Sequence, residues 1–444
     1  VPVHAIAILF ECPTLLVDQV VLALFDSSCV AIHDEICLMK LLYPDTLESL
    51  QNMVAEALAE ETALKIEGCG TLDGVGRPVN AQKCVSMKNY TGIIDYDPAE
   101  LVLVARAGTR LREVEELLAS ENQLLAFEPP HFNSLYEDVN AQPTNQTIGG
   151  VIGAGLAGSR RISAGSARDY LLGFTAVSGR AELFKSGGRV MKNVTGYDLS
   201  KLMTGSFGTL AIMDEITLKV LPAPEVAYSC IVPTSDMFAA QKIVSQIFAS
   251  PVEASGGVVV PVEIAKALSL DIGGQGAAAI IRIEGIEISV LDRINQIREL
   301  LCKTQECYLL ENQETTELWR VLCNGKPLSK SDQIWQISTP PASGPSLFKA
   351  ISDRTDISGF LDWAGGLVWI AGKSENLHDI VRTELACHRG GHATLLKADI
   401  NLRQHISVFQ PLPSALHALE VRVRDAFDPR HILNPNRTLP AIAS

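Results

Sequence analysis

Glycine and small polar residues gather at three places in the first half of the sequence. These are GCGTLDGVGRP (68–78), QPTNQTIGGVIGAGLAGS (142–159) and VMKNVTGYDLSKLMTGSFGTL (190–210). Glycine lets a backbone approach a ligand closely, and successive N–H groups in such a loop can form a nest for an anion. The three stretches therefore predict backbone that is held against a phosphate-bearing ligand.

The sequence context of the glycines argues against two common nucleotide-binding folds. Neither of the first two stretches is GxGxxG between a strand and a helix of a βαβ unit, and neither is GxxxxGK[ST]. The Rossmann and P-loop interpretations therefore fail on context. Taken singly, each stretch is more typical of ordinary tight turns. Together they favour one extended cofactor that carries phosphate.

Composition narrows the class of ligand and partner. The chain has 444 residues, enough for two or three domains, and a formal net charge of −14. An acidic chain without a basic block is a poor candidate for binding nucleic acid or an anionic membrane surface. The ten cysteines form no CxxC pair. This favours free thiols in a reducing cytosol over a zinc or iron–sulfur site.

Residues 1–42 are an N-terminal extension to which we assign no role. Their apolar first part is interrupted by Glu11, Pro13 and Asp18. It therefore reaches neither the ~20 apolar residues of a membrane span nor the pattern of a secretory signal.

The spacing of apolar residues predicts helices and strands in separate groups, which is typical of an α+β protein. Helices are expected at 43–61, 109–123, 236–250 and 413–427. Strands are expected at 63–68, 100–108 and 277–285, with a strand–turn–strand unit at 170–185. The two prolines of LPAPE (221–225) mark a domain boundary.

The order of these motifs resembles a known family. EGCGTLDGVGRP, TIGGVIGAGLAGSRR, AGSARDYLLG and SFGTL follow one another as in the FAD-binding domain of the p-cresol methylhydroxylase/vanillyl-alcohol oxidase superfamily. Within it, the chain resembles the FAD-binding subunits of bacterial glycolate oxidase. The resemblance begins near residue 43, is strongest from 65 to 222, and returns in DPRHILNPNR (428–437).

The resemblance implies a PCMH-type FAD-binding domain at 43–222 and an α+β cap or substrate-side domain at 223–400. A C-terminal segment, 401–444, would return to the flavin. FAD would be bound non-covalently. The residues implied to contact it are Gly68, Cys69, Gly70, Thr71, Gly74, Gly76, Thr147, Ile148, Gly149, Gly150, Gly165, Asp169, Asn193, Gly208, Ile212 and Asn434. Of these, Thr147 to Gly150 would form a second cofactor-facing loop.

One position departs from the family pattern. Where the first loop of the family usually has Ser-Lys or Thr-Lys after its glycine, this chain has Thr71-Leu72-Asp73. A carboxylate beside a pyrophosphate is unfavourable unless it points away.

Catalytic residues are less visible in the sequence. Oxidation of a 2-hydroxy acid by a flavin needs a base for the hydroxyl proton and a cation for the carboxylate. His131 in EPPHF is a candidate base, and it also fits an ordinary turn. Tyr197 could orient the cofactor, or it could pin the turn that contains it. Gly390 and Gly391 separate His388 from His392, so we predict no metal site.

The resemblance implies a subunit of a glycolate oxidase (glycolate dehydrogenase) complex that oxidises glycolate to glyoxylate and passes electrons to a respiratory acceptor. Its partners would be a larger FAD subunit and an iron–sulfur subunit. It would be cytoplasmic, reaching the inner face of the cell membrane only through the complex. Two alternatives stay open: a self-sufficient FAD-dependent 2-hydroxy-acid oxidoreductase, and a non-catalytic assembly subunit with a vestigial FAD site.

Overall fold

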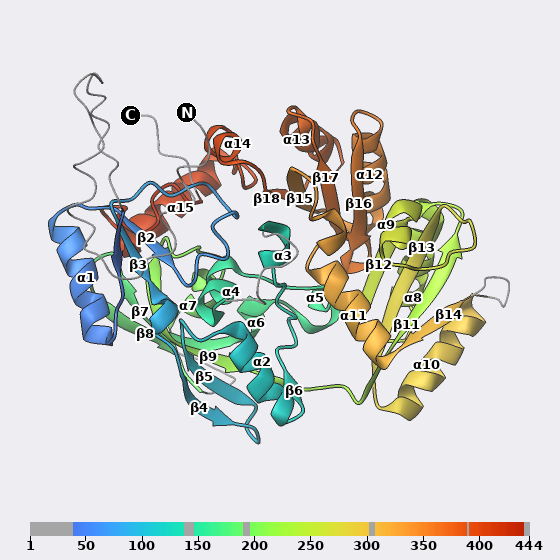
Figure 1. Cartoon of the computed structure of the whole chain (residues 1–444), viewed down its shortest axis with the longest axis horizontal. Coiled ribbons are helices and arrows are strands. Elements are labelled where there is room, and N and C mark those ends of the chain that lie inside the picture. Colours follow the sequence, from blue (N-terminus) through green and yellow to red (C-terminus); the bar gives the residue numbers. More distant parts are fainter. Residues whose placement is uncertain (1–38, 137–145, 190–195, 302–306, 389, 439–444) are drawn as a thin grey trace, which may run out of the picture. The chain divides into compact units, whose positions relative to one another are not determined.

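The computed structural model describes residues 39–136, 146–189, 196–301, 307–388 and 390–438 (Figure 1). Most of its strands lie in two large antiparallel sheets, one from each half of the chain. Helices are grouped around these sheets rather than alternating with parallel strands, which confirms the α+β prediction. Within the described part of the chain, no helix is long and apolar enough to cross a membrane.

The first half contains a small parallel sheet and a larger antiparallel one. The parallel sheet has the order β1 (Lys40–Leu42), β3 (Lys83–Ser86), β2 (Leu64–Glu67). The larger sheet has the order β4 (Ile93–Asp97), β5 (Val102–Arg106), β9 (Ala211–Lys219), β7 (Leu171–Ser178), β8 (Leu183–Gly187). β6 (Gln123–Leu124) pairs with β10 (Leu221–Pro222), where the chain leaves this half.

The second half is built on one eight-stranded antiparallel sheet. Its order is β14 (Tyr308–Glu311), β11 (Val226–Thr234), β13 (Ala277–Gly285), β12 (Gly256–Pro261), β16 (Ile357–Asp362), β17 (Leu367–Gly372), β15 (Gln333–Ser338), β18 (His392–Lys397). One face is covered by α8 (Met237–Phe248), α10 (Glu287–Leu300), α12 (Gly344–Ser352) and α13 (Leu377–Cys387) (Figure 1).

The remaining helices are mostly short. In the first half they are α1 (Leu47–Ala59), the 3-10 helix η3 (Met87–Asn89), α2 (Leu111–Ser120), α3 (Asn133–Tyr136), α4 (Ile148–Ala154), α5 (Arg161–Ala164), α6 (Ala167–Tyr170) and α7 (Leu199–Met203). In the second half they are α9 (Val262–Ala267), α11 (Asn312–Cys323), η4 (Lys326–Leu328), η5 (Pro341–Ser343), η6 (Trp363–Gly365), α14 (Ile400–His405) and α15 (Ser414–Phe427).

Local sequence signals explain the longer helices. Thr46 caps α1, and its hydroxyl accepts a hydrogen bond from the Ser49 backbone N–H at 3.0 Å. Asp236 caps α8 by the same contact to the Ala239 N–H at 2.9 Å. These two helices and α15 lie within the stretches predicted to be helical.

Residues Thr147 to Gly150 were predicted to form a loop that faces the cofactor. The loop is wrong, because Thr147 caps helix α4 and the next three residues form its first turn. Three glycines in seven residues disfavour a helix in isolation. Here the tertiary contact decides, since the Gly149 N–H donates to the Ala107 carbonyl at 2.8 Å. A Cβ at Gly149 would lie 2.7 Å from that same oxygen, so the helix needs glycine to pack there.

The core joins the two large sheets. Ala105 of β5 and Ile152 of α4 belong to the same cluster of buried side chains as Val260 of β12 and Trp369 of β17. The chain also returns to its beginning, because residues 432–434 lie beside β2. Leu64 N–H donates to the Ile432 carbonyl at 2.7 Å, and Asn434 N–H donates to the Leu64 carbonyl at 2.9 Å.

Candidate functional site

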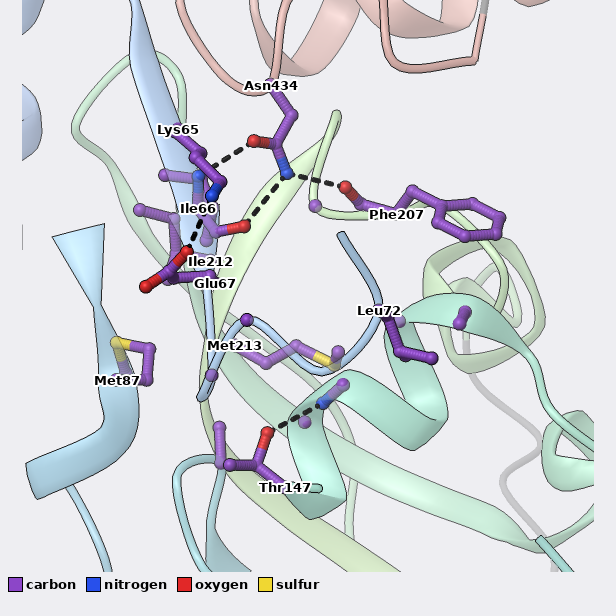
Figure 2. A pocket seen from close by; sticks show the side chains of 18 of the residues that line it. Lys65, Ile66, Glu67, Leu72, Met87, Thr147, Phe207, Ile212, Met213 and Asn434 are labelled. Carbon is purple, nitrogen blue, oxygen red and sulfur yellow. Dashed lines mark hydrogen bonds and ion pairs between the residues drawn. The ribbon is translucent and has the colours of Figure 1, made fainter. Parts of the chain in front are cut away.

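An open cavity of about 820 Å³ lies where β2, α4, β9 and residues 434–437 meet (Figure 2). Much of its wall is backbone, because six of the lining residues are glycines: Gly68, Gly70, Gly149, Gly150, Gly153 and Gly208.

One wall is the loop of residues 68–76 that follows β2. Its turns are closed by hydrogen bonds from Asp73 N–H to the Gly70 carbonyl (3.1 Å) and from Val75 N–H to the Leu72 carbonyl (3.0 Å). Among the described residues, none accepts a hydrogen bond from the N–H groups of residues 69–72. Buried or half-buried N–H groups need an acceptor. This row of donors therefore fits an anionic ligand such as a diphosphate.

The facing wall is the start of α4. The Thr147 hydroxyl accepts a hydrogen bond from the Gly150 N–H at 3.2 Å and so fixes the first turn. The two walls touch at Gly68, where a Cβ would lie 2.2 Å from Thr147 Oγ1. Gly68 is thus required by the contact between the loop and the helix.

Asn434 closes the far side of the cavity (Figure 2). Its Oδ1 accepts from Ile66 N–H at 2.7 Å, and its Nδ2 donates to the Phe207 carbonyl at 2.7 Å and the Ile66 carbonyl at 3.2 Å. Gly208, with φ +68°, follows this contact, and a Cβ there would lie 3.0 Å from Asn434 Nδ2. One side chain thus joins β2, the turn before β9 and the C-terminal segment.

The outer edge of the 68–76 loop carries charge. Lys65 Nζ lies 2.8 Å from Glu67 Oε2 and 2.5 Å from Asp73 Oδ2. Burial alone would lower the pKa of Lys65, but the hydrogen bonds to Asp73 and Glu67 raise it above its ordinary value. Lys65 therefore stays charged beside the unpaired N–H groups.

The remaining surface is apolar and comes from Ile66, Leu72, Met87, Ile212 and Met213 (Figure 2). Such side chains suit flat aromatic rings, while the loop suits phosphate. The cavity thus offers both surfaces that a dinucleotide cofactor needs.

Ten of the residues predicted to contact the cofactor line the cavity: Gly68, Cys69, Gly70, Thr71, Thr147, Gly149, Gly150, Gly208, Ile212 and Asn434. Their contacts to FAD stay predictions. Asn193 lies outside the described residues. The other predicted residues do not line the cavity: Gly74, Gly76, Ile148, Gly165 and Asp169.

Contacts with neighbouring residues give these five residues structural roles outside the cavity wall. A Cβ at Gly74 would lie 2.2 Å from the ring of Tyr136, and one at Gly76 would lie 3.0 Å from Arg437 Nε. Ile148 is fully buried in the core. The Asp169 carboxylate accepts from the Ser166 N–H at 2.9 Å and caps α6 directly after Gly165.

The two candidate catalytic residues do not line the cavity. His131 Nε2 lies 3.1 Å from Glu115 Oε1, and its backbone N–H donates to Asn324 Oδ1 at 2.8 Å. Tyr197 is 90% exposed. Both catalytic assignments stay predictions, and the structure brings neither residue into the cavity wall.

Sequence reasoning missed several residues that shape the cavity: Lys65, Leu72, Met87, Phe207, Met213 and Arg437. Two carried a signal. Lys65 is the charged residue in the strand directly before the glycine-rich loop, and Arg437 ends the ILNPNR motif. Leu72 and Phe207 lie inside the motifs GCGTLDGVGRP and SFGTL, but nothing in those motifs singled them out, and Met87 and Met213 carried no signal.

A buried ionic network lies between α5 and the eight-stranded sheet. Arg282 Nη1 donates to Glu128 Oε1 at 2.7 Å, and Arg160 Nε donates to Glu284 Oε2 at 3.0 Å. Arg282 and Glu284, which the sequence suggested as a pair, also approach to 3.4 Å. Burial alone would raise the pKa of Glu284, but the two arginines lower it to about 2. This network connects the two halves of the chain.

A second open cavity, of about 1070 Å³, shares Phe207 with the first. Arg77, His392, His417 and Glu420 are among the residues that line it. Burial raises the pKa of Glu420. A guanidinium, two imidazoles and a carboxyl group thus lie beside the first cavity.

The fold and the cavity define a class of flavoprotein. The chain superposes on p-cresol methylhydroxylase with a TM-score of 0.67 and 13% identity, covering 90% of this chain and 88% of that one. The profile of a family described as "FAD binding domain" matches residues 40–187. The chain therefore has the PCMH-type FAD-binding fold, and FAD is its cofactor.

The particular family follows from a relative in Escherichia coli (strain K12). The chain is 33% identical to "Glycolate oxidase subunit GlcE" over 399 residues, which cover 88% of this chain and 97% of the relative. The chain belongs to the GlcE family. It is also 30% identical to "Glycolate oxidase subunit GlcD" of Bacillus subtilis, over 42% of this chain and 37% of that protein.

Proposed function

We propose that this chain is the FAD-binding subunit of a complex that oxidises glycolate to glyoxylate. The observation that carries the proposal is the match to GlcE over 97% of that relative's length. The cavity supports it, because its walls combine unpaired N–H groups with an apolar surface.

Bound FAD would supply the acceptor for the hydride that leaves the 2-hydroxy acid. The chain's own residues would bind and orient this cofactor. The N–H groups of residues 69–72 would hold the diphosphate, and Asn434 would keep the walls at β2 and Phe207 in place. Ile66, Met87 and Met213 would exclude water from the ring surfaces.

We propose a larger FAD subunit and an iron–sulfur subunit as partners, since one relative is named as another subunit of glycolate oxidase. The proposed division of this chain is an FAD domain at 43–222, a cap at 223–400 and a returning segment at 401–444. The complex would hold the chain at the cytoplasmic face of the membrane and pass electrons to a respiratory acceptor.

The second cavity favours a second candidate, a chain that oxidises a 2-hydroxy acid without partners. Arg77 offers a cation for a carboxylate, and His392 or His417 offers a base for the hydroxyl proton. The cavity adjoins the cofactor cavity through Phe207, so an acid bound there would lie near it.

One experiment separates these functions. The absorbance spectrum of the purified chain is recorded for the visible bands of flavin, and the protein is then denatured to release any bound FAD. Oxidation of glycolate is next assayed with a dye as electron acceptor, for the chain alone and with its partner subunits. The proposal expects released FAD and turnover only in the complex. Turnover by the chain alone, lost in His392→Ala but kept in the surface control His378→Ala, would favour the second candidate. A chain that takes up no FAD would leave an assembly subunit.

A further inference from the structure

Two arginines from the C-terminal part of the chain hold the loop of residues 68–76 from behind. Arg437 Nη2 donates to the Leu72 carbonyl at 2.7 Å, and its Nη1 donates to the Arg77 carbonyl at 3.1 Å. Arg403, on α14, donates from Nη1 to the carbonyls of Asp73 at 2.9 Å and Gly76 at 3.2 Å. Their two guanidinium groups therefore bind four backbone carbonyls between residues 72 and 77.

Both arginines are buried and lack a carboxylate partner. Arg403 is 9% exposed and Arg437 is 7% exposed. Within the described part of the chain, neither forms an ion pair with an acidic side chain. The carboxylate of Asp73, which lies in the loop itself, is bound by Lys65. Asp73 and Asp399 both act on Arg403 electrostatically without forming an ion pair with it.

Burying an unpaired charge is costly, so two such charges side by side need an explanation. Burial is the main cause that lowers the pKa of Arg437; the charge of Asp73 opposes this effect, and the nearby Arg403 adds to it. A guanidinium nevertheless keeps its proton in a protein. The positive charge behind the loop is therefore permanent, and in a poorly solvated place it acts more strongly than a surface charge would.

We propose that Arg403 and Arg437 are positioning residues for the cofactor's diphosphate: they fix the loop whose N–H groups face the cavity, and they add buried positive charge to that of Lys65. This inference rests on the proposed function, since it takes the 68–76 loop as the diphosphate site. It explains why a chain with net charge −14 needs no basic surface patch to hold an anionic cofactor.

The chain offers a matched control. Arg382 also binds carbonyl oxygens, those of Ala393 and Phe409 at 2.8 Å each, and lines neither cavity. Its replacement should remove a comparable set of hydrogen bonds without removing charge from the loop. Comparing Arg437→Met and Arg403→Met with Arg382→Met therefore separates a general loss of stability from a loss of cofactor binding.

The measurement is FAD affinity of the full-length apoprotein, by fluorescence titration at several salt concentrations, together with thermal unfolding of the same samples. Arg437→Met and Arg403→Met should each weaken FAD binding about tenfold or more and flatten its salt dependence. Arg382→Met should lower the unfolding temperature while leaving the affinity of the folded protein unchanged. Arg437→Lys should restore part of the salt dependence, because it restores the charge.

Unchanged affinity and salt dependence in both arginine variants would overturn the inference. Should either methionine variant fail to fold, Arg403→Gln and Arg437→Lys carry the same comparison. Absence of FAD binding by the wild-type chain would instead count against the proposed cofactor cavity. The two failures are therefore distinguishable.

Discussion

The ammonium of Lys65 lies 2.5 Å from Asp73 Oδ2 and 2.8 Å from Glu67 Oε2. This contact explains how the chain tolerates Asp73 in the loop that is proposed to hold the diphosphate, one residue after Leu72, which stands where the family pattern has a lysine. The positive charge comes from β2, eight residues earlier in the sequence, and it holds the carboxylate of Asp73. The departure at Thr71-Leu72-Asp73 is therefore compatible with the proposed diphosphate site.

The pair predicts opposite effects of its two members on FAD affinity. Lys65→Met leaves Glu67 and Asp73 without their cation beside the diphosphate, so FAD binding should weaken about tenfold or more. Asp73→Asn removes a half-exposed negative charge, so FAD binding should tighten, though only about two- to fivefold because solvent screens it. Isothermal titration of FAD into each apoprotein measures both.

Lys83 is the matched control for Lys65. It also binds two carboxylates, Glu56 and Glu60 at 2.8 Å each, but lies away from the cavity wall. Lys83→Met should leave FAD affinity unchanged. An equal loss of affinity in Lys65→Met and Lys83→Met would show that the effect is one of stability and not of charge at the loop.

The parts of the site that the sequence predicted are those built from local backbone. Gly68, Gly70 and Thr147 were visible because glycine and capping residues have few other uses in such patterns. Arg403 was not visible, because it contacts a residue 330 positions away in the sequence. Arg437 ends the ILNPNR motif, but nothing near it indicated its contact with a residue 365 positions away. No local pattern encodes such contacts.

The same limit applies to the fold. The helices with clear caps and apolar spacing, such as α1 and α8, were predictable from their own residues. The helix α4 was not, because its glycines disfavour a helix and only the close approach of Gly149 to Ala107 explains them. Tertiary packing overrode propensity at the residues that face the cavity.

Asn434 is predicted to contribute strongly to stability and to cofactor binding. It has φ +39°, so glycine relieves the backbone, but Asn434→Gly removes three hydrogen bonds that join Ile66 to Phe207. Buried groups left without partners cost about 1–3 kcal/mol each, so the free energy of unfolding should fall by about 2–4 kcal/mol. Urea unfolding measures this loss, and FAD affinity should fall with it.

Asn436 is the control for the effect of a positive φ angle on an Asn→Gly substitution. It also has a positive φ, +62°, but it is exposed and makes no such bridge. Asn436→Gly should change the free energy of unfolding by no more than about 0.5 kcal/mol. Equal effects of the two substitutions would contradict the bridging role of Asn434.

The buried network of Glu128, Arg282, Arg160 and Glu284 predicts a large loss when one member is neutralised. Glu128→Gln leaves Arg282, which is 2% exposed, without its 2.7 Å partner. Breaking a buried pair typically costs about 3–5 kcal/mol, because it strands the other charge. Denaturant unfolding should show a loss of this size.

An exposed pair on α11 provides the comparison. Arg320 and Glu317 approach to 2.6 Å, but both side chains are more than half exposed. Glu317→Gln should therefore change the free energy of unfolding by less than about 0.5 kcal/mol. A similarly small effect of Glu128→Gln would mean that the network does not join the two halves of the chain.

Asp362 should make the free energy of unfolding depend on pH. It is 2% exposed, and its Oδ2 accepts from the Ser159 hydroxyl at 2.6 Å. Burial, the main cause, raises the pKa of Asp362 to about 6. In the unfolded chain the pKa would be about 3.9. The folded state therefore holds the proton of Asp362 more tightly than the unfolded state does. The contribution of protonated Asp362 to the free energy of unfolding is complete below about pH 4 and is lost as the pH rises through about 6.

Asp362→Asn should remove this loss, because an amide does not ionise. The free energy of unfolding of the variant minus that of the wild type should rise by about 2–3 kcal/mol between about pH 4 and pH 7. The changed hydrogen bond adds a difference that does not vary with pH. Urea unfolding across that range at constant salt measures the difference. Glu284 titrates near a pKa of about 2 and does not interfere. A difference that does not change with pH would mean that Asp362 is ionised in the folded chain, with its charge stabilised by neighbours other than Ser159.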